Sequence, residues 1–425
     1  MLHHFTQNSF AEIAVVGGGA AGFFAAIHAA AHLPKGKVVL FEKTSKLLSK
    51  VKISGGGRCN LTHACFSVQE MSKNYPRGEK IMKKLLPRFM TNDTIEWFES
   101  RGVLLKTEAD GRVFPISDNS QTIVDLLIKE AQHNGVKIFT SHQVTEIIPE
   151  NGLFKLQLSS TGQVCFYARK VIVATGGNSK LESFQWLARL GHCIEPPVPS
   201  LFTFNMPQEN ITQLQGISLA KAIVKIIGTD FIQCGPLLIT HWGMSGPAVL
   251  KLSAWAARWI AEKNYHFSVL VRWVGDADEA SLRQQLAQHQ FLNKQKQLGN
   301  SNPVQLPARL WEFLLCKAGI QPTKTWQQAG KGDFNKIVNI LRNDVYQVSG
   351  KTTYKEEFVT CGGVSVEDIY HQDLQSKKLP GLYFAGEVLD IDGITGGFNF
   401  QAAWTTGYIA GTSAARSLNG QYEGF

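Results

Sequence analysis

Runs of apolar residues near the start of the chain predict a strand, a helix and a second strand in close succession. The apolar run Glu12 to Val16 is typical of a short buried strand, and the glycine-rich segment 17–22 follows it immediately. Residues Phe23 to Leu33 are rich in alanine and contain no helix-breaking residue, which predicts a helix. A second apolar run, Lys37 to Phe41, ends at the acidic residue Glu42. This order is typical of the first unit of a dinucleotide-binding domain.

The pattern continues with helices and then strands. Helices are predicted at Glu79–Phe89, Asp93–Arg101 and Ser120–His133, and strands at Val136–Thr140, Leu153–Leu158, Val164–Ala168 and Lys170–Ala174. The second and third of these strands flank a polar segment that contains a glycine, so they predict a hairpin. The last strand runs into Thr175-Gly176-Gly177, a second glycine-rich strand exit.

The character of the sequence changes near Glu195, where Pro196, Pro197 and Pro199 predict a domain boundary. Beyond it we expect strands at Phe202–Met206, Ala222–Ile227, Phe231–Ile239 and Tyr265–Val274, and helices at Asp276–Phe291, Leu306–Lys317 and Asp333–Val348. No second strand followed by G-x-G-x-x-G occurs in this region. We therefore interpret the insertion as a substrate or lid module and not as a second nucleotide-binding domain.

The C-terminal part of the chain returns to the pattern of the first. The segment Gly381 to Glu387 predicts a strand with a third glycine-rich exit, and Gln401 to Leu418 predicts a long helix. Asp392 to Asn399, which precedes that helix, is also rich in glycine. Such a helix entry offers backbone N–H groups and a positive dipole end, which suit the electron-rich pyrimidine edge of a reduced flavin.

Length and composition describe an ordinary soluble protein. A chain of 425 residues exceeds the size at which one core keeps growing, so two or three domains are expected. Met1 to Phe10 lacks the apolar core of a signal peptide, and no segment reaches the ~20 apolar residues of a membrane span. The seven cysteines are scattered without a Cys-x-x-Cys pair, which argues against a disulfide framework or structural zinc. We therefore expect a protein of the reducing cytoplasm.

The formal net charge of +9 is unevenly distributed. The segment Lys43 to Lys106 holds 13 lysines and arginines against 5 acidic residues, an excess of 13 − 5 = +8. The simpler interpretation is a solvated basic face around an anionic cofactor. The more specific interpretation is a surface that binds nucleic acid.

The glycines of the first turn have distinct predicted tasks. Gly17 permits the tight turn, Gly19 lets the backbone reach a pyrophosphate at the helix N-terminus, and Gly22 lets helix and strand pack closely. Glu42 lies 20 residues after Gly22 and accepts hydrogen bonds from ribose hydroxyls. An acid at this position favours the unphosphorylated ribose of FAD or NAD over that of NADP.

The segment Ser54 to Asn60, with the sequence SGGGRCN, concentrates further candidate chemistry. Its three consecutive glycines allow the backbone to approach a planar or phosphorylated ligand, while Arg58 offers a fixed charge and Cys59 a thiol. A plain NAD-dependent dehydrogenase is disfavoured, because it would give the second and third glycine-rich strand exits no role.

Taken together, several blocks resemble the BaiN-like (YhiN-type) bacterial flavoproteins. The blocks are Ser54 to Asn60, Gly111 to Pro115, the THWGMSGP run from Thr240 to Pro247, Cys361 to Val364, and Gly386 to Asn399. They are spread over nearly the whole chain, and SGGGRCN and THWGMSGP are specific to that family. The resemblance implies an α/β fold in which a glutathione-reductase-like, FAD-binding Rossmann domain is interrupted by a β-barrel and a helical module.

The predicted domain boundaries follow from this architecture. The FAD-binding domain is discontinuous and comprises residues 1–194 and 356–425. Residues 195–275 with 345–355 form the β-barrel-like insertion, and residues 276–344 form the helical module.

The resemblance also implies which residues hold FAD. Gly17, Gly19 and Gly22 lie at the pyrophosphate, with the helix-entry residues Ala20 and Ala21, while Glu42 lies at the adenosine ribose and Val144 near the adenine. Along the cofactor path lie Ala174, Thr175, Gly176 and Gly177, then Gly386 and Glu387 at the ribityl and phosphate part, and Gly397, Phe398 and Asn399 at the isoalloxazine. Further cofactor contacts are expected from Lys43, Gly56, Gly57 and Cys59, while Lys50, Lys52 and Arg58 balance phosphate charge.

Members of the family are associated with reducing conjugated or ring C=C bonds, in uridine of ribosomal RNA or in steroid-type enones. We expect NAD(P)H to reduce FAD transiently, after which hydride passes to an activated C=C bond and a protein acid adds the proton. Cys59, perturbed by Arg58, and His241 are the candidate acids, against the alternatives that Cys59 only packs on the flavin and His241 is structural. The choice between NADH and NADPH and the oligomeric state stay open.

Three functions are carried forward from the sequence. The basic segment Lys43 to Lys106 favours ribosomal RNA as the substrate, and a small enone-type metabolite is the alternative within the same reaction class. The third is a non-catalytic, flavin-dependent redox sensor or assembly factor that binds RNA or protein without turnover.

Overall fold

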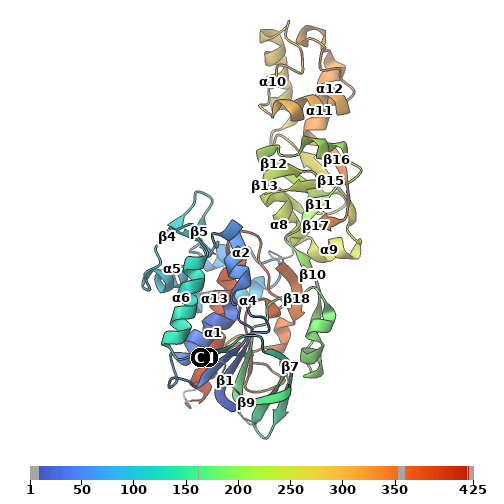
Figure 1. The fold of residues 1–425 in the computed structure, drawn as a ribbon. Helices are drawn as coiled ribbons and strands as arrows, with labels where there is room; N and C mark the ends of the chain where they lie inside the picture. Colours follow the sequence, from blue (N-terminus) through green and yellow to red (C-terminus); the bar gives the residue numbers. More distant parts are fainter. Residues whose placement is uncertain (1–8, 161, 353–358, 419, 421–425) are drawn as a thin grey trace. The chain divides into compact units, whose positions relative to one another are not determined.

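The computed structural model describes residues 9–160, 162–352, 359–418 and 420 (Figure 1). The chain divides into two compact units, of which the first comprises Met1–Pro199 and Lys355–Phe425 and the second Ser200–Tyr354. The first unit is therefore built from both ends of the chain, and the second unit is continuous in sequence. None of the helices in the described ranges is long and apolar enough to cross a membrane.

A seven-stranded sheet forms the centre of the first unit. Its strand order is β6-β2-β1-β9-β8-β7, and β19 also pairs with β9. The strands are β1 (Ser9–Val16), β2 (Val38–Phe41), β6 (Lys137–Phe139), β7 (Gln143–Glu150), β8 (Leu153–Ser160), β9 (Gly162–Val173) and β19 (Leu382–Phe384). The β6, β2, β1, β9 and β19 pairings are parallel, and β7, β8 and the first part of β9 form an antiparallel layer. The parallel strands align their carboxyl ends, where α/β sheets bind ligands.

Two helices pack against each other at very short range beside this sheet. Helix α1 (Ala20–Ala30) contacts α13 (Phe398–Leu418) along glycines of α13. A Cβ atom on Gly407 would lie 2.7 Å from the carbonyl oxygen of Ala21, and one on Gly411 would lie 2.3 Å from that of Ala25. The absence of side chains at Gly407 and Gly411 therefore allows the two helix backbones to approach each other.

Smaller elements complete the first unit. A three-stranded antiparallel sheet has the order β3-β5-β4, and β10 pairs with β18. The elements are α2 (Ser49–Gly57), β3 (Thr62–His63), α3 (Val68–Ser72), α4 (Glu79–Leu85), α5 (Thr91–Glu99), β4 (Leu105–Thr107), β5 (Arg112–Pro115), α6 (Gln121–His133), α7 (Gln185–Arg189), β10 (Ile194–Ser200) and β18 (Val359–Val364). Short 3₁₀ helices lie at Leu86–Arg88, Leu181–Phe184, Val366–Asp368 and Gly386–Val388, the last labelled η6.

The second unit combines a second seven-stranded sheet with helices. Its strand order is β16-β15-β12-β13-β14-β11-β17, and its helices share one apolar core with the sheet. The strands are β11 (Thr203–Asn205), β12 (Ser218–Ile226), β13 (Ile232–Thr240), β14 (Gly243–Ser245), β15 (His266–Arg272), β16 (Asp344–Ser349) and β17 (Lys351–Thr352). The helices are α8 (Pro247–Trp255), α9 (Ala257–Glu262), α10 (Glu279–Leu292), α11 (Ala308–Lys317) and α12 (Lys331–Arg342), with 3₁₀ turns at Asn210–Leu214 and Trp326–Gln328.

Two sequence predictions of secondary structure were wrong. The helix predicted at Asp333–Val348 ends at Arg342, and Asp344–Ser349 is strand β16. Its burial alternates from residue to residue, and the buried Asp344 carboxylate accepts hydrogen bonds from Trp273 (2.8 Å) and Lys317 (2.6 Å). The strands predicted at Val164–Ala168 and Lys170–Ala174 form the single long strand β9, because its first part pairs with β8 and the part from Phe166 to Val173 pairs with β1. Strand β7 and helices α8 and α9 were not predicted.

Candidate functional site

The glycines of the first glycine-rich turn have two different environments: Gly17 and Gly22 are tightly packed, and Gly19 faces open space. Gly17 has a φ of +116°, and a Cβ there would lie 2.3 Å from the carbonyl oxygen of Ala174. A Cβ at Gly22 would lie 1.9 Å from the carbonyl oxygen of Gly17. At Gly19, by contrast, a Cβ would meet no atom within 4 Å, and this residue is the N-cap of α1. The helix N-terminus therefore presents backbone N–H groups to open space, an arrangement that fits a pyrophosphate.

Glu42 is held rigidly at the end of β2. One carboxylate oxygen accepts from the N–H of Gly18 at 2.9 Å, and the other accepts from the N–H and the hydroxyl of Thr44, each at 2.9 Å. A carboxylate has about four acceptor positions, so Glu42 retains capacity for a ribose hydroxyl. Sequence reasoning identified Glu42 but missed Gly18 and Thr44, which orient it.

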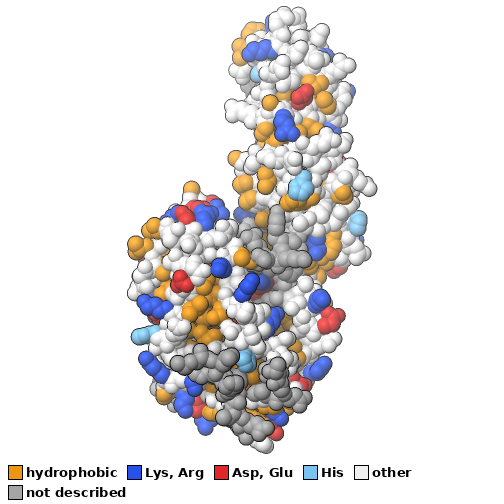
Figure 2. Space-filling model, in the orientation of Figure 1, with side chains coloured by type: hydrophobic (Ala, Val, Ile, Leu, Met, Phe, Trp, Pro, Cys, Tyr) orange, Lys and Arg blue, Asp and Glu red, His pale blue; other side chains and the backbone are white. Residues whose placement is uncertain are grey.

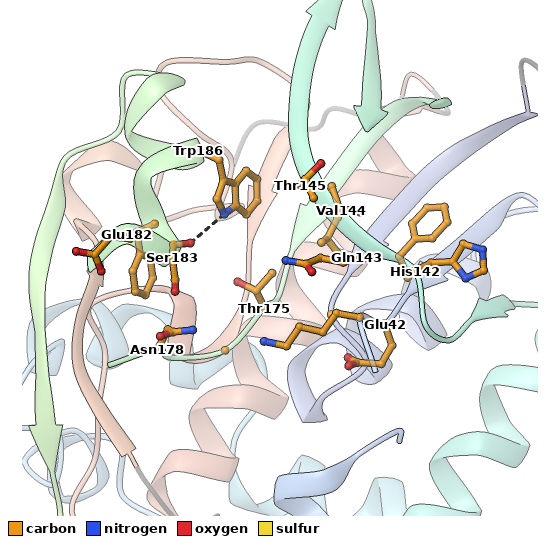
Figure 3. A pocket seen from close by; sticks show the side chains of 16 residues that line it. Glu42, His142, Gln143, Val144, Thr145, Thr175, Asn178, Glu182, Ser183 and Trp186 are labelled. Atoms are coloured by element: carbon orange, nitrogen blue, oxygen red, sulfur yellow. Dashed lines mark hydrogen bonds between the residues drawn. The ribbon is translucent and has the colours of Figure 1, made fainter. Parts of the chain in front are cut away.

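A cavity of about 270 Å³ lies beside Glu42 (Figure 3). It brings together six of the predicted cofactor residues, which are Gly17, Glu42, Lys43, Val144, Thr175 and Gly176. Sequence reasoning missed the other lining residues, which are Val16, Phe41, His142, Gln143, Thr145, Asn178, Glu182, Ser183, Phe184 and Trp186. Val16 and Phe41 are the last residues of parallel strands and could have been found, because ligands bind at the carboxyl ends of such strands. The segment Glu182–Trp186 carried no such signal.

The second and third glycine-rich exits meet the first at the N-terminus of α1. The N–H of Ala174 donates to Val16 at 2.8 Å, which places the second exit beside Gly17. The N–H of Gly386 donates to the Thr406 hydroxyl at 2.8 Å. A Cβ on Gly386 would lie 2.6 Å from the Cβ of Ala21. Three exits that are far apart in sequence thus converge on one helix end.

The carboxylate of Glu387 connects three segments of the first unit. It accepts from Lys50 Nζ at 2.7 Å and from the N–H of Thr360 at 2.8 Å. A Cβ on Gly177 would lie 2.8 Å from the same carboxylate and from the hydroxyl oxygen of Thr360. That hydroxyl is buried and has no hydrogen-bond partner within the described ranges of the chain. An orphaned buried hydroxyl fits a site that receives a polar ligand group.

The Gly-rich segment Ser54 to Asn60 forms a kinked end of α2. Residues 55–57 all have left-handed φ values, of +58°, +69° and +84°. A Cβ on Gly56 or Gly57 would meet no atom within 4 Å, so these two glycines leave the backbone open to a ligand. The N–H of Ser120 donates to the carbonyl of Gly57 at 2.8 Å and anchors the loop.

Cys59 is fully buried at the end of this loop. Its backbone has a φ of +61°, and its N–H donates to the carbonyl of Ser54 at 3.0 Å. Burial raises the pKa of the Cys59 thiol to about 12, and a hydrogen bond with Ser54 offsets this only in part. The expectation that Arg58 perturbs this thiol is not supported, since burial and Ser54 account for the pKa. Cys59 is therefore a protonated thiol at neutral pH.

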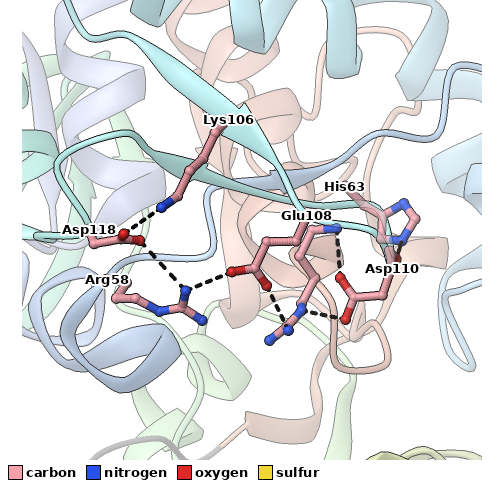
Figure 4. A network of polar contacts seen from close by, with 7 residues as sticks. Arg58, His63, Lys106, Glu108, Asp110 and Asp118 are labelled. Carbon is pink, nitrogen blue, oxygen red and sulfur yellow. Dashed lines mark hydrogen bonds and ion pairs between the residues drawn. The ribbon is translucent and has the colours of Figure 1, made fainter.

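The guanidinium of Arg58 belongs to a network of ion pairs (Figure 4). It lies 2.7 Å from Glu108 and 3.6 Å from Asp118, and it stacks 4.1 Å above the ring centroid of Phe114. Hydrogen bonding to Glu108 raises the pKa of Arg58 further above its ordinary value. The charge of Arg58 is thus balanced by carboxylates of the protein, and its expected role of offsetting phosphate charge stays a prediction.

The entry to α13 uses its side chains internally. The Asn399 amide donates to the carbonyl of Gly393 and accepts from its N–H, both at 2.9 Å. The Phe398 ring stacks on His63 with a centroid distance of 4.8 Å. A Cβ on Gly397 would lie 2.4 Å from the carbonyl oxygen of Thr62. The side chains of Phe398 and Asn399 thus make contacts within the protein, and the predicted isoalloxazine contacts of this helix entry stay a prediction.

His241 lies in the second unit, between β13 and β14. Its side chain is exposed, and its ring centroid lies 4.3 Å from that of Trp242. The indole N–H of Trp242 donates to Thr203 at 3.1 Å. These contacts give His241 a defined place in the second unit, and its catalytic role stays a prediction.

Comparison with known families identifies one match over most of the chain. Residues 11–413 match the family described as "HI0933-like protein Rossmann domain". A 3-dehydro-bile acid delta(4,6)-reductase of Clostridium scindens is 28% identical over 422 residues, covering 95% of this chain and 99% of that protein. A ribosomal RNA dihydrouridine synthase of Haemophilus influenzae is 30% identical over 424 residues, covering 96% of this chain and all of that protein, at 100%.

Solved structures with a similar fold are much more distant in sequence. A 3-ketosteroid-delta4-(5alpha)-dehydrogenase from Rhodococcus jostii has a TM-score of 0.52 at 15% identity, covering 96% of this chain and 98% of that one. The FrdA chain of an E. coli quinol fumarate reductase has a TM-score of 0.51 at 15% identity, covering 99% of this chain and 72% of that one. These likenesses concern the fold. The predicted fold class, a mixed α/β protein with an FAD-binding Rossmann-type domain, is confirmed.

Proposed function

This chain belongs to the HI0933-like family, and from that premise we propose that it is an FAD-dependent oxidoreductase that reduces an activated C=C bond. The observation that carries the proposal is the convergence of three glycine-rich strand exits on the N-terminus of α1, beside a cavity that contains Glu42. Such an arrangement fits a dinucleotide with its pyrophosphate at the helix end and a ribose at Glu42.

Different residues of the site would bind different parts of FAD. The N–H groups that follow Gly19 hold the pyrophosphate, and the carboxylate of Glu42 accepts from the adenosine ribose. The open backbone of Gly56 and Gly57 allows close approach of the ring system. When bound, FAD supplies the hydride-transfer chemistry of the reaction.

The reaction class is supported by what two relatives are named for. Dihydrouridine is uridine in which one ring C=C bond has been reduced, and a delta(4,6)-reductase acts on ring double bonds of a bile acid. Both reactions add hydrogen across a C=C bond beside a carbonyl group. We therefore extend this reaction class to the present chain, with NAD(P)H as the electron donor.

Uridine in ribosomal RNA is the proposed substrate. The segment Lys43 to Lys106 has an excess of +8, and Lys80, Lys83 and Lys84 on α4 are all exposed. A basic surface binds the phosphates of RNA and makes the affinity fall steeply with salt concentration. A small enone is the second candidate, supported by the similarity to the bile acid reductase.

Cys59 and His241 remain the two candidate proton donors. A thiol with a pKa of about 12 holds its proton at neutral pH, but it is a weaker general acid than a group that titrates near 7. The Cys59→Ala variant tests this role: a normal rate of flavin reoxidation with retained FAD would remove Cys59 from the mechanism. The His241→Gln variant provides the parallel test for the exposed histidine.

The experiment that tests the function starts with the absorption spectrum of the purified full-length chain. Bound FAD should give flavin bands, and NADH or NADPH should bleach them under anaerobic conditions. Ribosomal RNA fragments or an enone such as a 3-ketosteroid should then restore the oxidised spectrum. Dihydrouridine content of ribosomal RNA from cells with and without the gene identifies the substrate. A flavin that NAD(P)H reduces but neither acceptor reoxidises would favour the non-catalytic sensor or assembly factor.

A further inference from the structure

The cavity beside Glu42 has an aromatic wall that the sequence patterns did not indicate. Trp186 lies in α7, on the segment that follows the strand exit Ala174–Gly177, and α7 packs beside β7. Its indole is directed toward the side of the cavity formed by Val144 and Thr145 (Figure 3). Val144 belongs to the other wall and is only 8% exposed.

The plane of this indole is fixed by its own polar group. Trp186 Nε1 donates to the carbonyl of Ser183 at 3.1 Å, one turn earlier in the chain. The side chain is partly buried, and its only polar atom is thereby satisfied within the segment. A fixed indole offers a flat apolar face, on which nucleic-acid bases stack favourably regardless of their identity.

The charges of the cavity disfavour a phosphate as its main occupant. Its lining contains two carboxylates, Glu42 and Glu182, and one lysine, Lys43. The balance of −2 + 1 = −1 disfavours an anion and favours a neutral ring system with hydroxyl groups. Gln143 and Thr145 add an amide and a hydroxyl, which can pair with the nitrogen atoms at the edge of a purine.

We propose that Trp186 stacks on the adenine ring of the bound dinucleotide, with Val144 on the opposite face of the ring. A nucleoside whose ribose lies at Glu42 extends its base away from the pyrophosphate, into the part of the cavity that Val144 and Trp186 line. The inference rests on the proposed function only in taking FAD as the dinucleotide. It assigns the segment Leu181–Arg189 a direct part in cofactor binding.

Binding of AMP to the full-length chain, freed of flavin and checked by circular dichroism, tests the proposal. AMP should quench tryptophan fluorescence in the wild type and in Trp259→Phe, a control in α9 of the second unit. Trp186→Ala should bind AMP about tenfold more weakly, and Trp186→Phe within about threefold of wild type, because a phenyl ring retains stacking. Ribose 5-phosphate should cause no quenching in any of these proteins.

The holoprotein supplies a second measurement. FAD should dissociate about tenfold faster from Trp186→Ala than from wild type, as followed by the rise of flavin fluorescence after dilution. Equal AMP affinity and equal FAD release in Trp186→Ala and wild type would overturn the stacking proposal while leaving the proposed function intact. AMP binding that depends on Trp186, in a protein that shows no C=C reductase activity, would support the stacking proposal and contradict the proposed function.

Discussion

The ammonium group of Lys50 and the carboxylate of Glu387 lie 2.7 Å apart, although 337 positions separate them in the sequence. The pair joins the start of α2 to the 3₁₀ turn η6 that follows β19. Lys50 is about half exposed, so solvent screens its share of the interaction.

Removing the two partners of this ion pair should have unequal effects on stability. Lys50→Ala should lower the free energy of unfolding by less than about 0.5 kcal/mol, as is usual for exposed pairs. Glu387→Ala should cost about 1–2 kcal/mol, because it also leaves the N–H of Thr360 without its acceptor. Urea denaturation of both variants measures the difference. Equal losses would show that the ion pair dominates.

Added side chains at the α1–α13 contact should destabilise the first unit. Gly411→Ala should cost about 1–3 kcal/mol and Gly407→Ala somewhat less, since their Cβ atoms would meet the α1 backbone at 2.3 Å and 2.7 Å. Gly332→Ala in α12 is the matched control, because a Cβ there meets no atom within 4 Å. It should be neutral or stabilising by up to about 1 kcal/mol. Thermal unfolding of the three variants tests this order.

Two glycines of the first turn should separate folding from cofactor binding. Gly22→Ala should prevent normal folding, because its Cβ would lie 1.9 Å from the Gly17 carbonyl oxygen. Gly19→Ala should fold normally, since its Cβ meets no protein atom within 4 Å. It should bind FAD more weakly, because the added methyl group would occupy space that the pyrophosphate needs. The FAD content per chain and the melting temperature distinguish the two effects. Full FAD occupancy in Gly19→Ala would contradict the assigned pyrophosphate position.

Stability should fall in mild acid because of His28. Burial lowers the pKa of this α1 histidine to about 4, from an ordinary value of 6.5. Between these two values the unfolded chain binds more protons than the folded one, so stability is lost as the pH falls from 6.5 to 4. The loss attributable to His28 is on the order of 3 kcal/mol. His28→Phe should flatten this part of the stability–pH curve, and an unchanged slope would exclude His28 as its source.

The seven cysteines should differ in their reactivity toward N-ethylmaleimide. Cys193, Cys234 and Cys316 are exposed and should be alkylated first. Cys59 and Cys361 are buried, and the raised pKa of Cys59 further reduces its thiolate fraction. Mass spectrometry of the native protein after brief labelling should find both unmodified. Early labelling of Cys59 would show that the loop 54–60 opens readily in solution.

The sequence predicted best those features that depend on neighbouring residues. The turn from Gly17 to Gly22 and the acid at Glu42 could be recognised because their chemistry requires a fixed spacing. The ion pairs of Arg58 could not be predicted. Its partners Glu108 and Asp118 lie about 50 to 60 positions later in the chain, and the folding of the β4–β5 hairpin and the loop after it brings them beside Arg58. Trp186 belongs to no motif or periodic pattern. It reaches the cavity only because the short segment that carries it happens to pass there in the folded chain.

The break between α12 and β16 illustrates a second limit. Residues 333–348 are compatible with a helix by propensity, but the burial of every second residue from Asp344 onward comes from pairing with β15. Such pairing joins residues far apart in sequence and overrides local preference. The hairpin of β8 and β9, by contrast, could be predicted because its partners are adjacent in the chain.

The discontinuity of the first unit has a consequence for synthesis on the ribosome. Strand β19 and helix α13 complete the sheet and cover α1, yet they are translated after the entire second unit. The second unit is continuous and can fold as soon as it leaves the exit tunnel, whereas α1 keeps an apolar face exposed until the last segment emerges. During translation the nascent chain therefore passes through a stage in which the second unit is native, while the N-terminal part of the first unit is incomplete and vulnerable to aggregation.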